Sequence, residues 1–290
     1  MLNRKIMALG AGLLVSPIVS AGNINVGGVV WNPNSPLDMR MDSSFTQWFQ
    51  RSNSGFDMGN VVGINAGNAT SVMFGNYLYG GGKINNFNDA NDIDGQPEPE
   101  TDPPSFCPSC ELTYEFGGIQ FVENTAGGGD FTDPSTYTIN WDNSYFRIWV
   151  DEGKDFNANA DFNSDPDQMY KAANGDLFLE GKFEQVTFSN QDFAGGTLIS
   201  TAGAGMFVTG GMAMEYFDTN DFYDAALDMW FDLSYSASSQ FRVPADGSDV
   251  FFARASTGEV QGNTVPEPGA LALLGAGLIG LAVVRRRRTA

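Results

Sequence analysis

The amino-acid sequence predicts an all-β fold, an antiparallel β-sandwich or jelly roll, between a cleavable N-terminal signal helix and a C-terminal transmembrane helix. Two observations carry the all-β prediction: apolar and polar residues alternate over many short runs, and glycine-rich breaks separate these runs. About nine such runs in one chain favour a sandwich or jelly roll over a small barrel. We expect strands at 23–31, 71–80, 111–121, 135–141, 144–151, 176–189, 196–210, 226–236 and 248–256.

Residues 1–21 have the composition of a secretory signal peptide. Arg4 and Lys5 form a basic head, an apolar run follows, and the segment ends on small residues. Because the apolar run is short for a bilayer span, we expect cleavage between Ala21 and Gly22 rather than a retained N-terminal anchor.

The body of the chain, residues 22–264, is long enough for one large β domain with its own core. It holds 34 of the 35 acidic residues and 9 of the 15 basic ones, a formal charge of 9 − 34 = −25. Such a surface repels phosphate backbones, so we expect no nucleic-acid partner, and it favours interaction with divalent cations. A soluble acidic protein without a specific partner is the plainer alternative.

The chain contains no histidine, which removes most familiar catalytic sites. Ser-His-Asp and Cys-His arrangements and histidine-ligated zinc are excluded, and two cysteines cannot complete a four-thiolate site. Carboxylate chemistry such as glycoside hydrolysis remains, but 34 acids make any chosen pair uninformative. We therefore expect neither enzyme activity nor a required cofactor, with a secreted carboxylate-dependent glycan hydrolase as the alternative.

Cys107 and Cys110 lie just before the strand expected at 111–121. In an exported chain this spacing favours a disulfide, because residues i and i+3 of a turn approach within disulfide reach and Pro108 favours such a turn. A redox motif would be expected to open a helix, and a metal site is the remaining alternative. We predict a structural disulfide that adds little stability, since the loop it closes is short.

Three other segments depart from the simple strand pattern. Residues 43–51 are the main helical candidate, with Ser43 or Ser44 as N-cap and three aromatic residues on one face. Residues 135–151 predict a β-hairpin with the sequence DNS as its turn. Residues 85–106 are acidic and proline-rich, which indicates a long surface loop.

Between residues 151 and 167, Asp and Asn side chains recur at every second position. Alternating oxygen ligands in a tight loop are how EF-hand-like sites bind calcium, although the loop glycine and the closing glutamate of an EF-hand are absent. Calcium is therefore the candidate ligand, and a solvated loop or a polar edge strand is the alternative. The candidate ligands are Asp155, Asn157, Asn159 and Asp161.

The five tryptophans suggest carbohydrate as a second kind of partner, since aromatic faces exposed on a β protein can stack on sugar rings. We expect most of these side chains in the core, and polysaccharide remains a candidate ligand without an assigned residue. The five tryptophans are Trp31, Trp48, Trp141, Trp149 and Trp230.

Residues 265–290 form the most specific pattern in the chain. The 16 uncharged residues at 269–284 would span about 24 Å as a helix, somewhat less than a hydrocarbon core of about 30 Å. The basic residues that follow stay in the cytoplasm by the positive-inside bias, which places the body on the outer side of the inner membrane. Pro266 and Pro268 break regular structure before the helix and leave an extended, protease-accessible segment. The basic tail is Arg285, Arg286, Arg287 and Arg288.

The sequence Val265-Pro266-Glu267-Pro268, the apolar helix and the arginine cluster together resemble the PEP-CTERM sorting signal of Gram-negative bacteria. The resemblance covers residues 265–288 and implies recognition by an exosortase, a membrane cysteine protease that cuts near the motif. Pro266, Glu267 and Pro268 would be the recognition motif, and the four arginines the retained tail. The stretches VGGVVWNPNSP, ELTYEFGG and DLFLEGKFE are also similar to flocculation-associated PEP-CTERM proteins.

Proteins of this family occur with exopolysaccharide gene clusters, so the resemblance implies a role in the extracellular matrix. We expect a non-enzymatic protein that is exported through the inner membrane and transiently anchored by its C-terminal helix. It would then reach the cell surface or the exopolysaccharide matrix and promote flocs or biofilm. An uncleaved, membrane-anchored glycan-binding protein is the alternative that differs in processing.

Overall fold

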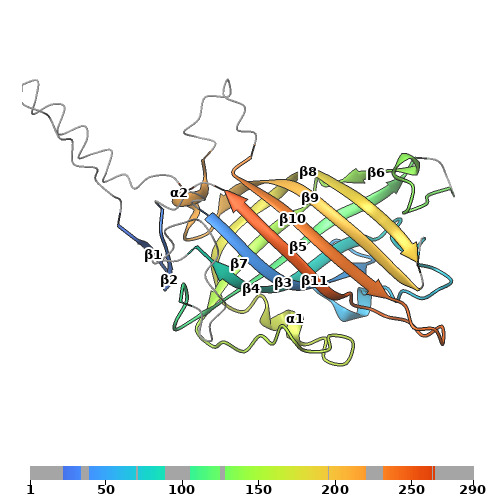
Figure 1. The fold of residues 1–290 in the computed structure, drawn as a ribbon, viewed down its shortest axis with the longest axis horizontal. Coiled ribbons are helices and arrows are strands. Elements are labelled where there is room, and N and C mark those ends of the chain that lie inside the picture. The colour runs from blue at the N-terminus through green and yellow to red at the C-terminus, as the bar shows by residue number, and fades with distance from the viewer. Residues whose placement is uncertain are drawn as a thin grey trace, which may run out of the picture.

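The computed structural model describes residues 22–33, 39–69, 71–88, 105–124, 128–194, 196–219, 231–262 and 264 (Figure 1). The predicted signal helix, the predicted transmembrane helix and Trp230 lie outside these residues. Within the part of the chain that the structure describes, no helix has the length and apolar character needed to cross a membrane.

One antiparallel sheet makes up the body, and it closes on itself (Figure 1). Its order is β4-β3-β11-β10-β9-β8-β7-β5, and β5 pairs again with β4, so consecutive strands are neighbours all the way round. The strands are β3 (Met39–Gln50), β4 (Tyr77–Phe87), β5 (Glu111–Glu123), β6 (Tyr137–Asn140), β7 (Tyr145–Asp151), β8 (Asp176–Ala194), β9 (Thr197–Gly210), β10 (Leu233–Arg242) and β11 (Arg254–Gly262).

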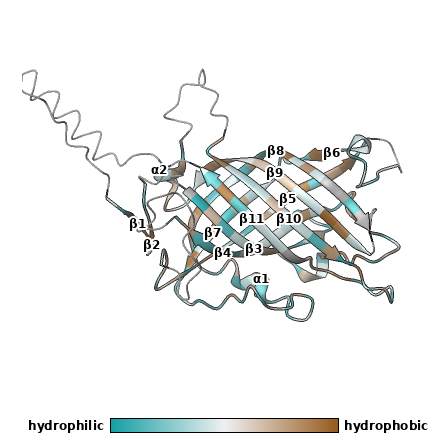
Figure 2. Cartoon of the chain, viewed as in Figure 1, coloured by the Kyte–Doolittle hydropathy of each residue, from teal (hydrophilic) through white to brown (hydrophobic). Residues whose placement is uncertain are grey.

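The fold is therefore an up-and-down β-barrel. The all-β prediction is confirmed, but the sandwich or jelly-roll arrangement is wrong. In Figure 2, apolar and polar residues alternate along the barrel strands. This alternation buries one face of a sheet in a sandwich and in a barrel alike, so the sequence pattern does not separate the two.

The predicted hairpin over residues 135–151 is also wrong, because β6 and β7 do not pair with each other. Both pair antiparallel with β5, β6 with residues 120–123 and β7 with residues 111–117. They therefore run in the same direction, end to end, with residues 141–144 as an interruption. Gly118 (φ +78°) lies opposite this interruption, where a Cβ would stand 2.1 Å from the carbonyl oxygen of Asn143, so only glycine fits.

Residues 43–51, the expected helix, belong mainly to strand β3. The misleading pattern has a physical cause: every residue from Phe45 to Gln50 is buried, so both faces of the strand are covered. Phe45 and Phe49 belong to the barrel core, whereas Trp48 belongs to a second cluster outside it. Because apolar residues are needed on both faces, the alternation that marks a strand disappears here.

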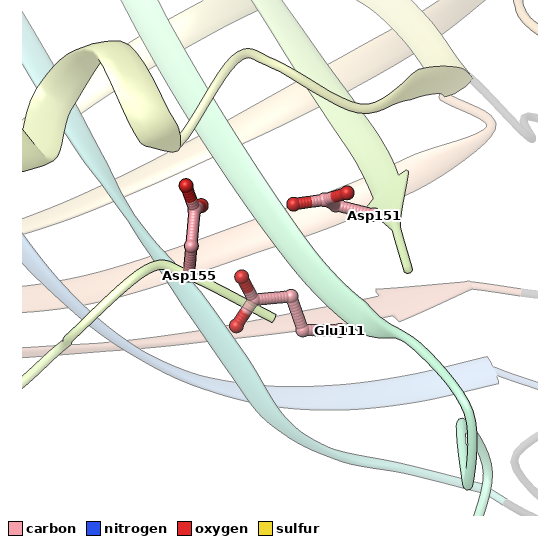
Figure 3. A group of neighbouring side chains, drawn as sticks. All are labelled: Glu111, Asp151 and Asp155. Atoms are coloured by element: carbon pink, nitrogen blue, oxygen red, sulfur yellow. The ribbon is translucent and has the colours of Figure 1, made fainter. Parts of the chain in front are cut away.

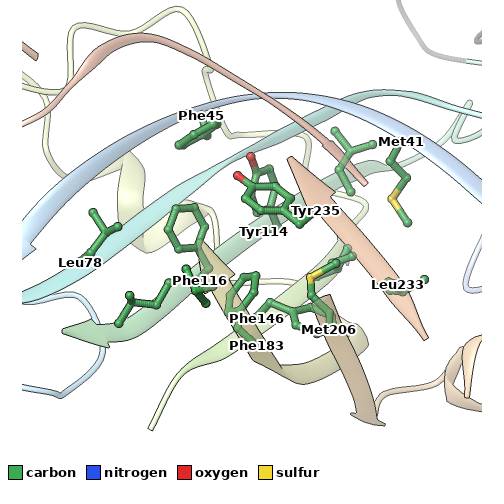
Figure 4. Packing of buried hydrophobic residues seen from close by; sticks show 14 of the residues in the cluster. Met41, Phe45, Leu78, Tyr114, Phe116, Phe146, Phe183, Met206, Leu233 and Tyr235 are labelled. Carbon is green, nitrogen blue, oxygen red and sulfur yellow. The ribbon is translucent and has the colours of Figure 1, made fainter. Parts of the chain in front are cut away.

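The barrel interior is filled with side chains (Figure 4). Phe116, Phe183 and Tyr235 contact one another at its middle, with ring centroids about 6 Å apart. Two cavities border these three residues, with volumes of about 20 and 30 Å³, room for no more than a few water molecules. The interior is thus a packed core.

A short N-terminal hairpin, β1 (Ile24–Val26) and β2 (Val29–Trp31), covers one end of the barrel beside α2 (Met214–Phe217) (Figure 1). Its Trp31 is fully buried and stacks on Phe217 with ring centroids 5.4 Å apart. Its edge also meets Phe87 at 5.8 Å. These contacts make Trp31 the central side chain of an aromatic plug.

The second apolar cluster lies between the barrel wall and the segment 152–175. This segment contains the short helix α1 (Gln168–Lys171). Two 3-10 turns lie elsewhere in the chain: η1 (Met58–Asn60) and η2 (Pro134–Thr136). The buried members of the cluster are Trp48, Val61, Tyr79, Phe156, Phe162, Met169, Ala172 and Phe252.

Candidate functional site

The sorting residues predicted from the sequence lie mostly outside the described part of the chain. This holds for Ala21, for the motif Pro266, Glu267 and Pro268, and for the four arginines of the tail. Gly22, the first residue after the predicted signal peptidase cut, is exposed.

Cys107 and Cys110 form a disulfide in the structure, with their Cα atoms 5.1 Å apart. The backbone N–H of Cys110 donates to the carbonyl of Cys107, as in a turn. Both cysteines are buried beside the N-terminal hairpin, whose Val30 N–H donates to the carbonyl of Phe106. A buried pair of this kind serves structure, since reactive thiols need access to solvent.

Two of the four predicted calcium ligands support their own loop. Asn157 Oδ1 accepts from the backbone N–H of Asn159, and Asp161 Oδ1 accepts from that of Asn163. These are Asx turns, which account for Asn157 and Asp161 in this run without a bound ion. Of the four predicted ligands, only Asp155 belongs to the group of acidic residues that the structure brings together.

Glu111, Asp151 and Asp155 form this group, each with a carboxylate oxygen within 4.8 Å of the others (Figure 3). Glu111 begins β5 and Asp151 ends β7, and the two are direct cross-strand partners. Asp155 comes from the segment that follows β7. Glu111 and Asp151 were not among the predicted ligands, although each stands at the end of an expected strand, because their contact depends on the register of β5 with β7.

The environment of the acidic cluster leaves one carboxylate oxygen unpaired. Glu111 is almost fully buried and accepts from the backbone N–H of Phe156 at 2.9 Å and from Lys83 Nζ at 3.1 Å. Asp151 Oδ1 accepts from the N–H of Gly153 at 2.8 Å, whereas its Oδ2 is buried and has no hydrogen-bond partner among the described residues. With Lys83 offsetting one of three negative charges, the cluster presents oxygen ligands of the kind that calcium binds.

A second group of carboxylates bears on the hydrolase alternative. Arg147 lies between Glu115, at 3.6 Å, and Glu180, at 3.2 Å, on the outer face of β5, β7 and β8. Burial raises the pKa of the Glu115 carboxyl above its usual range, and the Arg147 guanidinium partly opposes this shift. Both carboxylates thus have a structural partner in the same guanidinium.

The tryptophans that the structure describes do not form an exposed sugar-stacking platform. Trp31, Trp48 and Trp149 are buried, and Trp141 is half-buried against the core. Among the described aromatic residues, Tyr170 is the one with a large exposed fraction, 53%. Any polysaccharide contact within the described part of the chain must therefore rely mainly on polar side chains.

An acidic barrel covered at one end by aromatic side chains is followed by a proline-flanked acidic residue, an apolar segment and an arginine tail. This combination defines a class: exported proteins that carry a C-terminal sorting signal. Residues 264–288 match the family model described as the PEP-CTERM protein-sorting motif, and this confirms the resemblance. The chain therefore carries a PEP-CTERM sorting motif, which implies an exported protein that an exosortase processes. No curated protein and no solved structure matches it.

Proposed function

We propose that this protein acts without catalysis in the extracellular polysaccharide matrix, where it helps cells to form flocs or biofilm. The observation that carries the proposal is the sorting motif placed directly after a closed barrel with a packed interior. The two interior cavities leave no room for a substrate, and Arg147 pairs with both Glu115 and Glu180. The acidic surface supports a role among polymers that are bridged by cations.

Deletion of the gene tests this function. Cells without it are expected to disperse from flocs while the amount and chain length of secreted polysaccharide stay unchanged. Microscopy of aggregates and size-exclusion chromatography of the polysaccharide give the two readouts. A change in polysaccharide chain length with intact flocs would instead favour the carboxylate-dependent hydrolase.

Calcium is the cofactor that we propose for the matrix role, and the acidic cluster is its proposed site. The unpaired, buried Oδ2 of Asp151 favours this assignment, because an unpaired buried carboxylate oxygen is costly unless a cation or donor reaches it. The site differs from the sequence prediction, since it keeps Asp155 and replaces the other three ligands by Glu111 and Asp151.

The proposal predicts that calcium stabilises the purified protein. At a free calcium concentration one hundred times Kd, the free energy of unfolding should rise by about 2.7 kcal/mol. Asp155→Asn should remove this gain, whereas the matched control Asp161→Asn should keep it, because Asp161 supports its own turn. Thermal unfolding with and without calcium, together with calorimetric titration, measures both. Absence of heat and of any shift in the wild type would contradict the site.

A further inference from the structure

The outer wall of the barrel has a hollow of about 600 Å³ over β9, β10, β11, β3 and β4. This volume falls within the range of about 300–1,000 Å³ typical of ligand sites. The residues that line it are small or polar, and none is aromatic. The hollow is also open to solvent along the wall. This shape suits a polymer chain that lies along the surface better than a small molecule that must be enclosed.

Strand register places four hydroxyl groups in one row across the hollow. Ser238 pairs with Thr201 on one side and Thr257 on the other, and Thr257 pairs in turn with Ser44. Neighbouring strands lie about 4.8 Å apart, so the row spans about 14 Å. The same registers set a second outward row two residues away: Gly203, Ser236, Glu259 and Asp42.

We call these two rows the hydroxyl face. The hydroxyls of Ser236, Ser238 and Thr257 make no hydrogen bond to any described residue, so they remain available for a ligand. Ser44 bonds the side chain of Asn85, which fixes one edge of the face.

The chemistry of the hydroxyl face selects one kind of occupant. Hydroxyls both donate and accept hydrogen bonds, so the face complements a ligand rich in hydroxyl groups. The carboxylates of Asp42 and Glu259 both form ion pairs with Arg40, which holds them at the edge of the face and leaves further lone pairs to accept hydrogen bonds. The body carries a formal charge of −25, which repels polyanions. An apolar or aromatic ligand would find no surface to stack on, since the lining offers neither rings nor long aliphatic chains.

We propose that the hydroxyl face binds a strand of uncharged polysaccharide. The proposal rests on the proposed function for the presence of polysaccharide around the protein, and it names the chemical class that the protein would hold. The three free hydroxyls would bond the sugar hydroxyls, and the two carboxylates would orient the strand along the second row.

Affinity electrophoresis of the mature protein, as cells export it, tests this. The gels contain hydroxyethylcellulose, dextran, the neutral fraction of the cells' own polysaccharide, or acidic alginate. We expect retardation by at least one neutral polysaccharide and none by alginate. The triple variant Ser236→Ala/Ser238→Ala/Thr257→Val should bind at least about tenfold more weakly, as expected for three lost hydrogen bonds. Its unfolding temperature should stay unchanged, because the substitutions lie on the surface.

Ser234→Ala is the matched control, since Ser234 lies on the same strand outside the hollow and bonds the carbonyl of Gln261. It should bind like the wild type. Wild-type protein that passes unretarded through all three neutral gels, a triple variant that binds like the wild type, or retardation by alginate would each overturn the proposal. The gene deletion described above tests the matrix role separately, so failed binding would remove this inference and leave that role standing.

Discussion

Replacing Trp31 by alanine is expected to lower the free energy of unfolding by about 3–5 kcal/mol, the cost typical of removing a buried tryptophan. Trp31 is fully buried and contacts Phe87 and Phe217 at the covered end of the barrel. Its loss would leave a cavity and would also undock the hairpin that carries it. Denaturant unfolding followed by fluorescence measures the change.

Trp141→Ala provides the control for this experiment, because Trp141 is only half-buried and packs at the edge of the core. We expect it to cost clearly less than Trp31→Ala. Equal losses in the two variants would mean that the hairpin does not seal the barrel. A cleavage site for a protease, newly accessible within residues 22–33 of the Trp31 variant alone, would support the undocking.

Replacing Pro266, Glu267 and Pro268 together by alanine should stop processing. The apolar segment and the arginines would still hold the chain in the membrane, so we expect the full-length protein in the membrane fraction and no released form. Immunoblots of the fractions and the intact mass of the released protein are the measurements.

Exchange of the four arginines at 285–288 for lysine separates charge from recognition. Lysine keeps the positive-inside signal, so orientation should persist. Normal release would mean that charge alone suffices, whereas retention would assign the arginines to recognition. For the variant with alanine at residues 266–268, release of a protein whose mass includes the arginine tail would contradict processing at the motif.

The sequence was sufficient for local features and insufficient for contacts set by register. Residues 111–121 were predicted correctly as a strand, although most of β5 is buried on both faces. Alternation along residues 196–210 predicted β9 correctly, because buried positions alternate with more exposed ones over part of that strand. It failed at Phe45 to Gln50, where an outer segment covers the second face as well. Burial of both faces weakens the alternation that strand prediction depends on, and at residues 43–51 the spacing of the apolar residues favoured a helix instead.

Closure of the sheet into a barrel could not be predicted from sequence patterns, for a different reason. β3 pairs with β11, which lies about two hundred residues later, and no local pattern encodes such a pairing. The same limit applied to the acidic cluster. Asp155 stands in an obvious acidic run, but Glu111 joins it only through the pairing of β5 with β7.

The seam between β3 and β11 gives the protein an order of events. β11 ends at Gly262, where it pairs with Met39, and the sorting motif match begins at residue 264. During export, β3 has no partner on one of its edges until β11 has crossed the membrane and can pair with it. If residues 269–284 form the predicted membrane span, completion of the fold and arrival of the sorting signal at the bilayer coincide. A chain presented for cleavage would then be one whose body has fully emerged and can close.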